Sequence, residues 1–239
     1  MGESLVPDRW EEVFKKPGGS CQALFDHERK IVFIYTPKCG CTTAKSIFYD
    51  HVGVELPEKK FDIHTPSFYE KVKHFHEIKR GIDFDEYLKI QFYRDPFQRA
   101  ACCFAWNQEY KEHPVFYKPT NGQKLIQKDG YMAIECRFKC DSIHQFLEGL
   151  IKGSVAACHQ CRVHTIKQFV ETKIDEKVNI VNLDQELERL NKKYDLNFKN
   201  RSVEGHSLRK RGWKYDDYLD EKAIELIKKA YPEDVRFFS

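Results

Sequence analysis

The chain has 239 residues, of which 41% are hydrophobic, 14% aromatic and 32% charged, a composition that fits a folded globular protein and excludes a disordered one. This length suits one α/β domain, and we expect residues 1–239 to form a single domain. The 40 basic and 37 acidic side chains leave a net charge of only +3, which argues against nucleic-acid binding but allows a local basic site for an anionic ligand.

The first half of the chain has the pattern of a strand followed by a tight loop and a helix. Residues 22–25 predict an edge strand, and the apolar, β-branched run 31–35 predicts a central strand buried on both faces. A loop over 37–41 follows, and residues 42–51 then predict an amphipathic helix. The chain therefore has one complete strand, loop and helix unit near its start.

A second strand and helix pair follows after a crossover segment. Ser67 is expected to cap a helix that runs towards Lys79. Residues 88–93 predict another buried strand, and Pro96 is expected to open a helix through Trp106, because proline is tolerated in a first helical turn.

The second half contains a weakly periodic region and then three further elements. Residues 108–140 are rich in Lys, Gly, Tyr and Pro, and we expect them to form a substrate loop. The later elements are bounded by capping residues and apolar runs. They are a helix over 142–151 started by Asp141, a strand over 178–183, a helix to Tyr194 capped by Asp184, and a helix to Tyr231 capped by Asp220.

Strands that alternate with helices predict an α/β fold. We expect a P-loop-like, three-layer arrangement in which helices flank a central, mostly parallel sheet. No stretch reaches the roughly 20 apolar residues of a membrane span, and the start MGESLVPDRWEE lacks the regions of a signal peptide. The nine cysteines favour a reducing compartment. We therefore expect a soluble cytoplasmic protein, unless the chain is a luminal domain cut from a membrane-anchored parent.

The loop after the strand 31–35 is a predicted anion site. A strand that feeds a glycine-containing turn and then a helix presents free backbone N–H groups and the positive end of the helix dipole. It is not a Walker A loop, because Lys38 precedes the glycine, Gly40, and the hydroxyls of Thr42 and Thr43 follow it. This order disfavours nucleoside triphosphate chemistry.

The segment PKCGCTTAK resembles the 5′-phosphosulfate-binding loop of sulfotransferases that use 3′-phosphoadenosine-5′-phosphosulfate (PAPS). The resemblance implies that Lys38 contacts the bridging oxygen and the sulfuryl group. A fixed ammonium there stabilises the charge that develops on the leaving phosphate oxygen, so no metal is required. The remaining loop residues would bind the 5′-phosphate through backbone amides and hydroxyls: Cys39, Gly40, Cys41, Thr42 and Thr43.

The run KIQFYRDPFQRAACCFAW resembles the 3′-phosphate motif of the same family. Arg94 offers a planar fork to a phosphate at the end of a strand, beside a helix N-terminus. Family members place a serine eight residues later, where this chain has Cys102, a weaker donor. The matching residues are Arg94, Asp95, Pro96, Phe97 and Arg99.

Further segments resemble the carbohydrate-type, family 2-like branch of sulfotransferases. They are HTIKQF at 164–169 and the two tail segments at 177–190 and 215–238, so the resemblance covers about residues 30–238. LRKRGWK at 208–214 is interpreted as a solvated basic loop.

An acceptor hydroxyl needs a general base, and histidine has a pKa near neutrality. We choose His64, because some members of this branch carry a histidine between the first helix and the second strand. His74, His76 and Glu77 compete with it, although His76 is expected to face solvent. His159 and His164 are interpreted as structural.

Four cysteines leave three alternatives open. Paired ligands at such spacings, with two histidines nearby, could bind zinc, but reduced thiols are the favoured interpretation, and a disulfide between the two segments comes next. The cysteines are Cys136, Cys140, Cys158 and Cys161.

The expected function is transfer of a sulfuryl group from PAPS to an acceptor hydroxyl, without a metal. A glycan is the first candidate acceptor, with a small hydroxylated metabolite or a tyrosine behind it. Two other classes stay open: a P-loop small-molecule or nucleotide kinase, which would need magnesium and the missing Walker motif, and a non-catalytic nucleotide-binding relative.

Overall fold

The computed structural model describes residues 22–35, 39–58, 60–77, 83–109, 125–128, 131–134, 140–152, 174–201 and 214–238. These stretches contain six strands and seven α-helices, so the predicted α/β class is confirmed. None of the helices in them is both long and apolar enough to cross a membrane. The chain divides into two compact units, Met1–Asp95 with His164–His206 and Pro96–Val163 with Ser207–Ser239, and each is described by itself.

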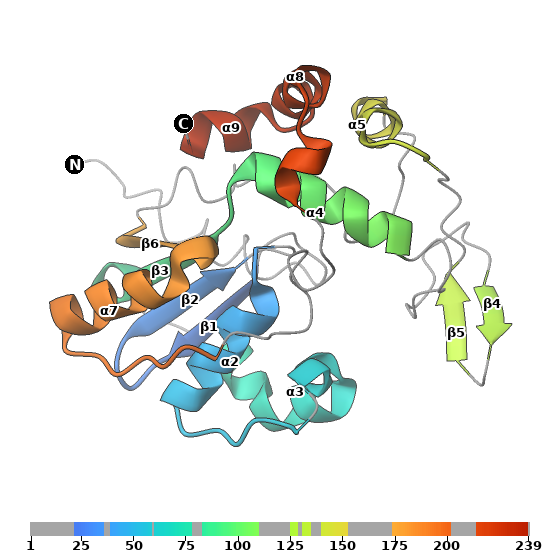
Figure 1. Cartoon of the computed structure of the whole chain (residues 1–239). Helices are drawn as coiled ribbons and strands as arrows, with labels where there is room; N and C mark the ends of the chain where they lie inside the picture. The colour runs from blue at the N-terminus through green and yellow to red at the C-terminus, as the bar shows by residue number, and fades with distance from the viewer. Residues whose placement is uncertain are drawn as a thin grey trace, which may run out of the picture. The chain divides into compact units, whose positions relative to one another are not determined.

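The first unit is built on a four-stranded sheet of order β1-β2-β3-β6 (Figure 1). β1 pairs antiparallel with β2, whereas β2, β3 and β6 run parallel to one another, so the sheet is mostly parallel as predicted. Tyr35 lies opposite Phe92, and Tyr93 lies opposite Asn179. The carboxyl ends of the three parallel strands therefore meet at one edge of the sheet. The strands are β1 (Gln22–Asp26), β2 (Ile31–Tyr35), β3 (Leu88–Tyr93) and β6 (Glu176–Asn179).

β2 confirms the prediction of an inner strand buried on both faces. All five of its residues are buried, as expected for an apolar run in a parallel sheet. β1 and β3 were also located correctly by their apolar runs, to within one residue.

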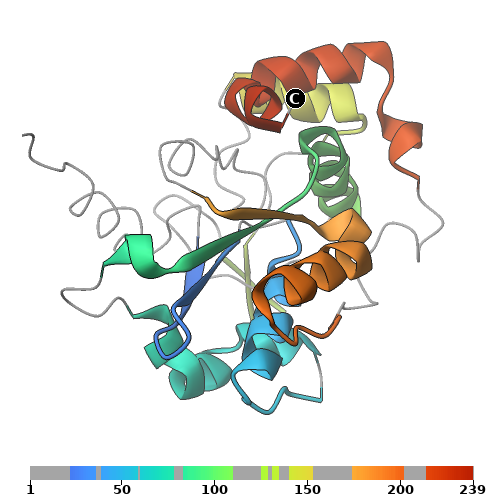
Figure 2. The same ribbon diagram turned by 90° about the vertical axis from the view of Figure 1, so that its left-hand side faces the viewer.

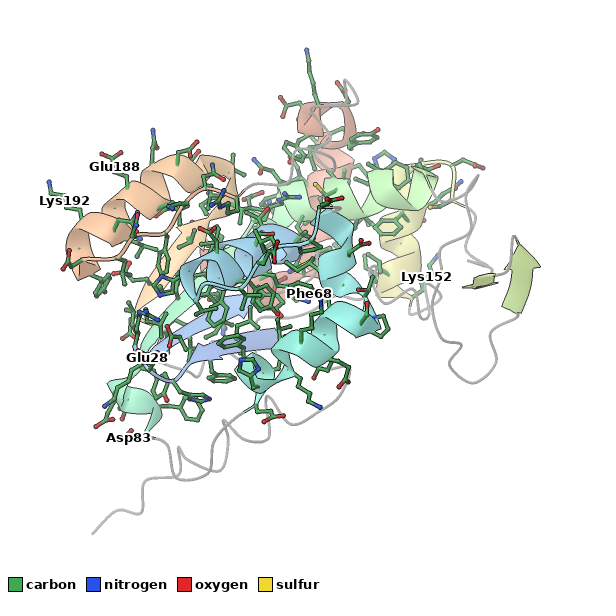
Figure 3. The ribbon with its side chains drawn as sticks, turned by 90° about the horizontal axis from the view of Figure 1, so that it is seen from below. Glu28, Phe68, Asp83, Lys152, Glu188 and Lys192 are labelled. Carbon is green, nitrogen blue, oxygen red and sulfur yellow. The ribbon has the colours of Figure 1, made fainter. Side chains whose placement is uncertain are left out.

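The helices α2, α3 and α7 share one apolar core with the sheet. Figure 2 shows α2 and α7 on the same side of the sheet. α7 buries Leu183, Leu187 and Leu190, whose spacing places them on one helical face. In Figure 3, Glu188 and Lys192 lie on the opposite, outer face of α7, whereas Phe68 belongs to the core. The bounds are α2 (Cys41–His51), α3 (Pro66–Val72) and α7 (Leu183–Tyr194), with 3-10 turns η1 (Lys60–His64), η2 (Lys73–His76), η3 (Phe84–Glu86) and η4 (Ile180–Asn182).

The predicted third parallel strand is present, but its bounds differ from the predicted 178–183, because β6 begins at Glu176 and ends at Asn179. The Asn179 side chain accepts the N–H of Val181 at 3.1 Å and turns the backbone into η4. At the amino end of β6, Glu176 places a charged side chain at a buried position of the strand, and side chains of α7 compensate that charge. Its carboxylate lies 2.6 Å from each of three donors, on Arg189, Lys193 and Tyr194.

Two predicted helix starts also need correction. α3 begins at Pro66 and is capped by Thr65, whose hydroxyl accepts the N–H of Phe68, so Ser67 is not the cap. The helix ends at Val72, and η2 follows it. α7 begins one residue before Asp184, which therefore lies in the first turn and is not the cap.

The described residues of the second unit form four helices and one pair of antiparallel strands. They are α4 (Pro96–Glu109), α5 (Ile143–Ile151), α8 (Glu221–Ala230) and α9 (Pro232–Phe238), with the 3-10 turn η6 (Tyr215–Tyr218) and the antiparallel strands β4 (Leu125–Lys128) and β5 (Tyr131–Ile134). Pro96 opens α4 as predicted, but the helix runs three residues past Trp106. The predicted cap Asp220 is confirmed by its 2.7 Å bond to the Ala223 N–H. Ser142, and not Asp141, caps α5.

The sequence reading missed α9 and the β4–β5 hairpin. α9 follows α8 directly, because Pro232 stops one helix and opens the next. Inside this unit Arg99 is buried, forms an ion pair with the fully buried Asp234 and lies over the Tyr231 ring. These contacts anchor α9 to α4 through one charged pair.

Candidate active site

The predicted anion loop follows the carboxyl end of β2. Residues 36–38 lie outside the described part of the chain, and with them the predicted catalytic cation Lys38. The description resumes at Cys39, which is buried, and α2 begins at Cys41. Thr42 and Thr43 occupy the first turn of α2 and are half-buried.

Gly40 is the residue that makes this turn possible. It adopts the left-handed conformation with φ 73°, and a Cβ atom there would lie 3.0 Å from both Cδ1 and Cγ2 of Ile180. Ile180 belongs to η4, which follows the carboxyl end of β6, so a segment two strands away in the sheet packs against the loop. Only glycine combines this backbone angle with this close approach.

The turn leaves the helix N-terminus open for an anion. The first helical bond runs from the Ala44 N–H to the Gly40 carbonyl at 2.8 Å. The N–H groups of the preceding residues, Cys41 to Thr43, have no acceptor within the helix and carry the positive end of the helix dipole. This arrangement fits the phosphate that the sequence motif predicts here.

His64, the predicted base, lies next to this loop. Its Nε2 atom is 2.8 Å from the Thr42 hydroxyl, although the two residues are 22 positions apart in the sequence. Its Nδ1 atom is 3.4 Å from Nζ of Lys45. The side chain is otherwise exposed, at the end of η1. The fold therefore joins the predicted base to the predicted phosphate site.

Lys45 lies beside His64, and the sequence analysis did not single it out. It is only 8% exposed, and its Nζ lies 5.6 Å from the centre of the Tyr35 ring. Burial lowers the pKa of Lys45 below that of an ordinary lysine. Its spacing from Cys41 and Phe48 places it on the inward stripe of the helix, and a lysine at such a position was the available signal.

His76, expected to face solvent, is instead half-buried beside this group. Its Nε2 is 3.1 Å from the Tyr49 hydroxyl, and its ring lies 5.1 Å from that of Tyr69. Burial, and then the charge of Lys45, lower the pKa of His76 to about 4. The solvent-facing prediction was wrong because η2 tightens the chain and turns this histidine inwards. The other two competitors, His74 and Glu77, are exposed.

Arg94 follows β3 directly and is half-buried. Because β3 runs parallel beside β2, Arg94 lies at the same edge of the sheet as the Gly40 loop. Polar groups at the carboxyl ends of neighbouring parallel strands are the usual ligand-binding elements of α/β sheets. The first unit thus brings together two of the predicted anion-binding elements.

Cys102 belongs to the second unit. It is buried on α4, and its Sγ lies 3.8 Å from the Tyr215 hydroxyl. Tyr215 begins η6 and lies 113 residues after Cys102, so sequence spacing could not have indicated this contact.

The cysteine cluster is described only at Cys140, which is buried and accepts a hydrogen bond from Gln108 through its carbonyl at 2.9 Å. Cys136, Cys158 and Cys161 lie outside the described stretches, as do His159 and His164. Among the residues whose placement is described, no group of three His, Cys, Asp or Glu side chains could hold a metal ion.

Residues 22–239 match a protein family described as the sulfotransferase family, so the match spans both units. Neither the search of curated proteins nor that of solved structures found a match.

Proposed function

This chain belongs to the sulfotransferase family, and from that premise we propose that it moves a sulfuryl group from PAPS to an acceptor hydroxyl. The observation that carries the proposal is the 2.8 Å contact between Thr42 and His64. It joins a phosphate-binding loop to a group that can take a proton. A P-loop kinase would need magnesium and a Walker A sequence at this place. The loop lacks that sequence.

The donor is bound at two phosphate positions. The open N–H groups at the start of α2, with the hydroxyls of Thr42 and Thr43, hold the 5′-phosphate. Arg94, at the same sheet edge, binds the 3′-phosphate through its planar fork, and the Cys102 thiol adds a weaker donor. The parallel sheet and the glycine turn support a P-loop-like, three-layer arrangement, with residues 1–239 working as one sulfotransferase domain.

The transfer is an in-line displacement at sulfur. The acceptor oxygen forms a bond to sulfur while its proton passes to Nε2 of His64. The bond from sulfur to the bridging oxygen breaks, and its electron pair stays on the 5′-phosphate. Lys38 stabilises the charge that develops on that oxygen, so the step needs no metal. The products are a sulfate ester and 3′,5′-bisphosphoadenosine.

The acceptor is a hydroxyl-bearing molecule, with a glycan as first choice and a small hydroxylated metabolite or tyrosine behind it. Residues 108–140, the predicted substrate region, select it, because segments outside a rigid scaffold commonly carry specificity. The nine cysteines favour the cytoplasm as the site of action, unless the chain is a luminal domain.

A transfer assay with two donors tests this proposal. The protein is incubated with a panel of glycans, small alcohols and tyrosine peptides, once with PAPS labelled in its sulfate and once with ATP and magnesium labelled in the γ-phosphate. We expect label from PAPS to appear on at least one class of acceptor. Label transferred from ATP instead would establish the kinase alternative and refute the proposal.

A further inference from the structure

Lys45 is a buried lysine in the second turn of α2, and no carboxylate among the described residues forms an ion pair with it. We infer that its ammonium binds an anionic oxygen at the 5′-phosphosulfate end of the donor, as a cation in addition to the predicted Lys38. This inference rests on the proposed function, because it adds a binding residue to the proposed phosphate site. It gives Lys45 a role in donor binding and not in packing alone.

The positive charge of Lys45 is not balanced by the groups that face it. The side chain is only 8% exposed, so water hydrates little of its charge. Its Nζ lies 5.6 Å from the centre of the Tyr35 ring, a contact that compensates part of the lost hydration. Nδ1 of His64, at 3.4 Å, adds no negative charge in either protonation state of the imidazole. An ammonium in these surroundings destabilises the protein until an anion joins it.

The two buried tyrosines of this cluster do not supply a negative charge either. Burial raises the pKa of Tyr35 and that of Tyr49, so both phenols stay neutral at physiological pH. The hydroxyl of Tyr35 is itself buried and has no hydrogen-bond partner among the described residues. Lys45 and Tyr35 are thus adjacent side chains, one with an uncompensated charge and one with an unsatisfied hydroxyl. Together they indicate a site for an anionic ligand that accepts hydrogen bonds.

The ammonium lies near the open end of α2, where we place the 5′-phosphate. Long side chains on a helix lean towards its N-terminus, so Lys45 points back to the turn that begins at Cys41. His64 indicates the same direction, because its Nδ1 faces Lys45 while its Nε2 is 2.8 Å from the Thr42 hydroxyl. The ammonium and that hydroxyl therefore flank one imidazole ring. Lys45 adds a full charge to a helix end that otherwise offers partial charges.

The donor fits this place better than the acceptor does. A side chain that is 8% exposed can be reached by a single phosphate or sulfuryl oxygen, but not by a sugar ring. The flexible four-carbon stem of lysine can turn the ammonium towards such an oxygen without a movement of the backbone. A charge-assisted hydrogen bond then replaces the lost hydration. Lys45 should therefore destabilise the ligand-free protein and strengthen donor binding, which are two effects of opposite sign.

The variant Lys45→Met tests the first effect, because methionine keeps an unbranched apolar side chain and removes the charge. We expect the Tm of the ligand-free protein to rise by about 2–4 °C, since a buried charge without a counter-charge is lost. Lys192→Met is the matched control, because it removes an exposed lysine from the outer face of α7, and it should shift Tm by less than about 1 °C. A Tm below that of the wild type in Lys45→Met would show that Lys45 stabilises the fold, and would overturn the inference.

Calorimetry with two nucleotides tests the second effect and locates the anion. Adenosine 3′-monophosphate lacks the 5′-phosphate that 3′,5′-bisphosphoadenosine carries. We expect Lys45→Met to weaken binding of the bisphosphate about tenfold or more, and binding of the monophosphate by less than about twofold. Lys45→Gln, which keeps a polar group without the charge, should lose as much affinity as Lys45→Met. Wild-type affinity for the bisphosphate in either variant would overturn the inference, and so would an equal loss for both nucleotides.

Failure of this inference can be distinguished from failure of the proposed function. A wild type that binds the bisphosphate, together with a Lys45→Met variant that binds it equally well, would leave the proposed function standing and overturn only the role of Lys45. A wild type that does not bind the bisphosphate would refute the proposed donor. Inorganic phosphate is then the probe. A rise in Tm with phosphate that Lys45→Met lacks would support an anion site at Lys45, and an equal rise in both proteins would exclude it.

Discussion

Replacing Gly40 with alanine tests the local structure on which the proposed phosphate site depends. Gly40 has φ 73°, and a Cβ atom would approach two side-chain carbons of Ile180 to 3.0 Å. Both the backbone and the packing therefore oppose a side chain at this position. The substitution adds one methyl group and no charge, so its effect reports on geometry alone.

Three contributions determine the expected change in the free energy of unfolding. The left-handed conformation costs an L-residue about 1–2 kcal/mol, and overpacking against Ile180 costs about 1–3 kcal/mol. Alanine regains about 0.4–1 kcal/mol by restricting the unfolded chain. We therefore expect a net loss of about 2–3 kcal/mol, which for a chain of this size lowers Tm by about 5–10 °C.

A double-mutant cycle with Ile180→Ala separates the two costs. Ile180→Ala removes the two carbons at 3.0 Å and leaves only its Cβ, at an ordinary 3.5 Å from the new methyl group. In that background Gly40→Ala should cost about 1 kcal/mol, so the coupling measured by urea unfolding should be about 1–2 kcal/mol. Additive effects, or a Gly40→Ala variant as stable as the wild type, would refute this geometry.

Three further predictions concern other charged and polar groups. Burial raises the pKa of Glu176, but hydrogen bonds from α7 outweigh it and lower the pKa to about 2. Because this folded-state pKa lies below the unfolded one, the stabilisation is complete above about pH 4.5 and lost as the pH falls towards 2. The pKa shift corresponds to up to about 3 kcal/mol of folding free energy. In urea unfolding, Glu176→Gln should therefore lose less stability than the wild type as the pH falls. An equal loss of stability in both proteins would contradict this prediction. Arg99→Met should cost about 3–5 kcal/mol in chemical unfolding, because it leaves Asp234 buried without its counter-charge. The double variant Arg99→Met/Asp234→Leu should recover most of that loss, and a double variant no more stable than the single one would count against the pair. Cys102→Ser should tighten the binding of 3′,5′-bisphosphoadenosine, measured by calorimetry, about threefold, because a hydroxyl donates more strongly than a thiol. Weaker binding would show that Cys102 does not contact the 3′-phosphate.

The inner strands and the glycine turn before α2 could be predicted from the sequence because local chemistry determines them. An unbroken apolar run such as Ile31–Tyr35 fits only a strand covered on both faces. Gly40, directly before a helix pattern, likewise marks a turn that needs a left-handed residue. In both cases the determining residues are neighbours in the chain.

Predictions from the sequence were wrong or incomplete where contacts between residues far apart in the chain determine the structure. Glu176 is buried in β6 only because donors on α7, 13 to 18 residues later, neutralise it. His76 turns inwards to meet Tyr49, 27 residues earlier. The helical spacing of Lys45 indicates an inward position, but only the fold shows that His64 lies against it. Such pairings depend on tertiary contacts that no local pattern encodes.

Calorimetric titration with 3′,5′-bisphosphoadenosine, compared with ATP and magnesium, is the most direct test of the donor assignment. We expect the wild type to bind 3′,5′-bisphosphoadenosine more tightly than ATP. Lys38→Ala and Arg94→Ala should each weaken that binding about tenfold or more, the value of a lost charge-assisted hydrogen bond. Lys30→Ala, the exposed control, should leave it unchanged. A wild type that prefers ATP with magnesium would contradict the assignment of PAPS as the donor.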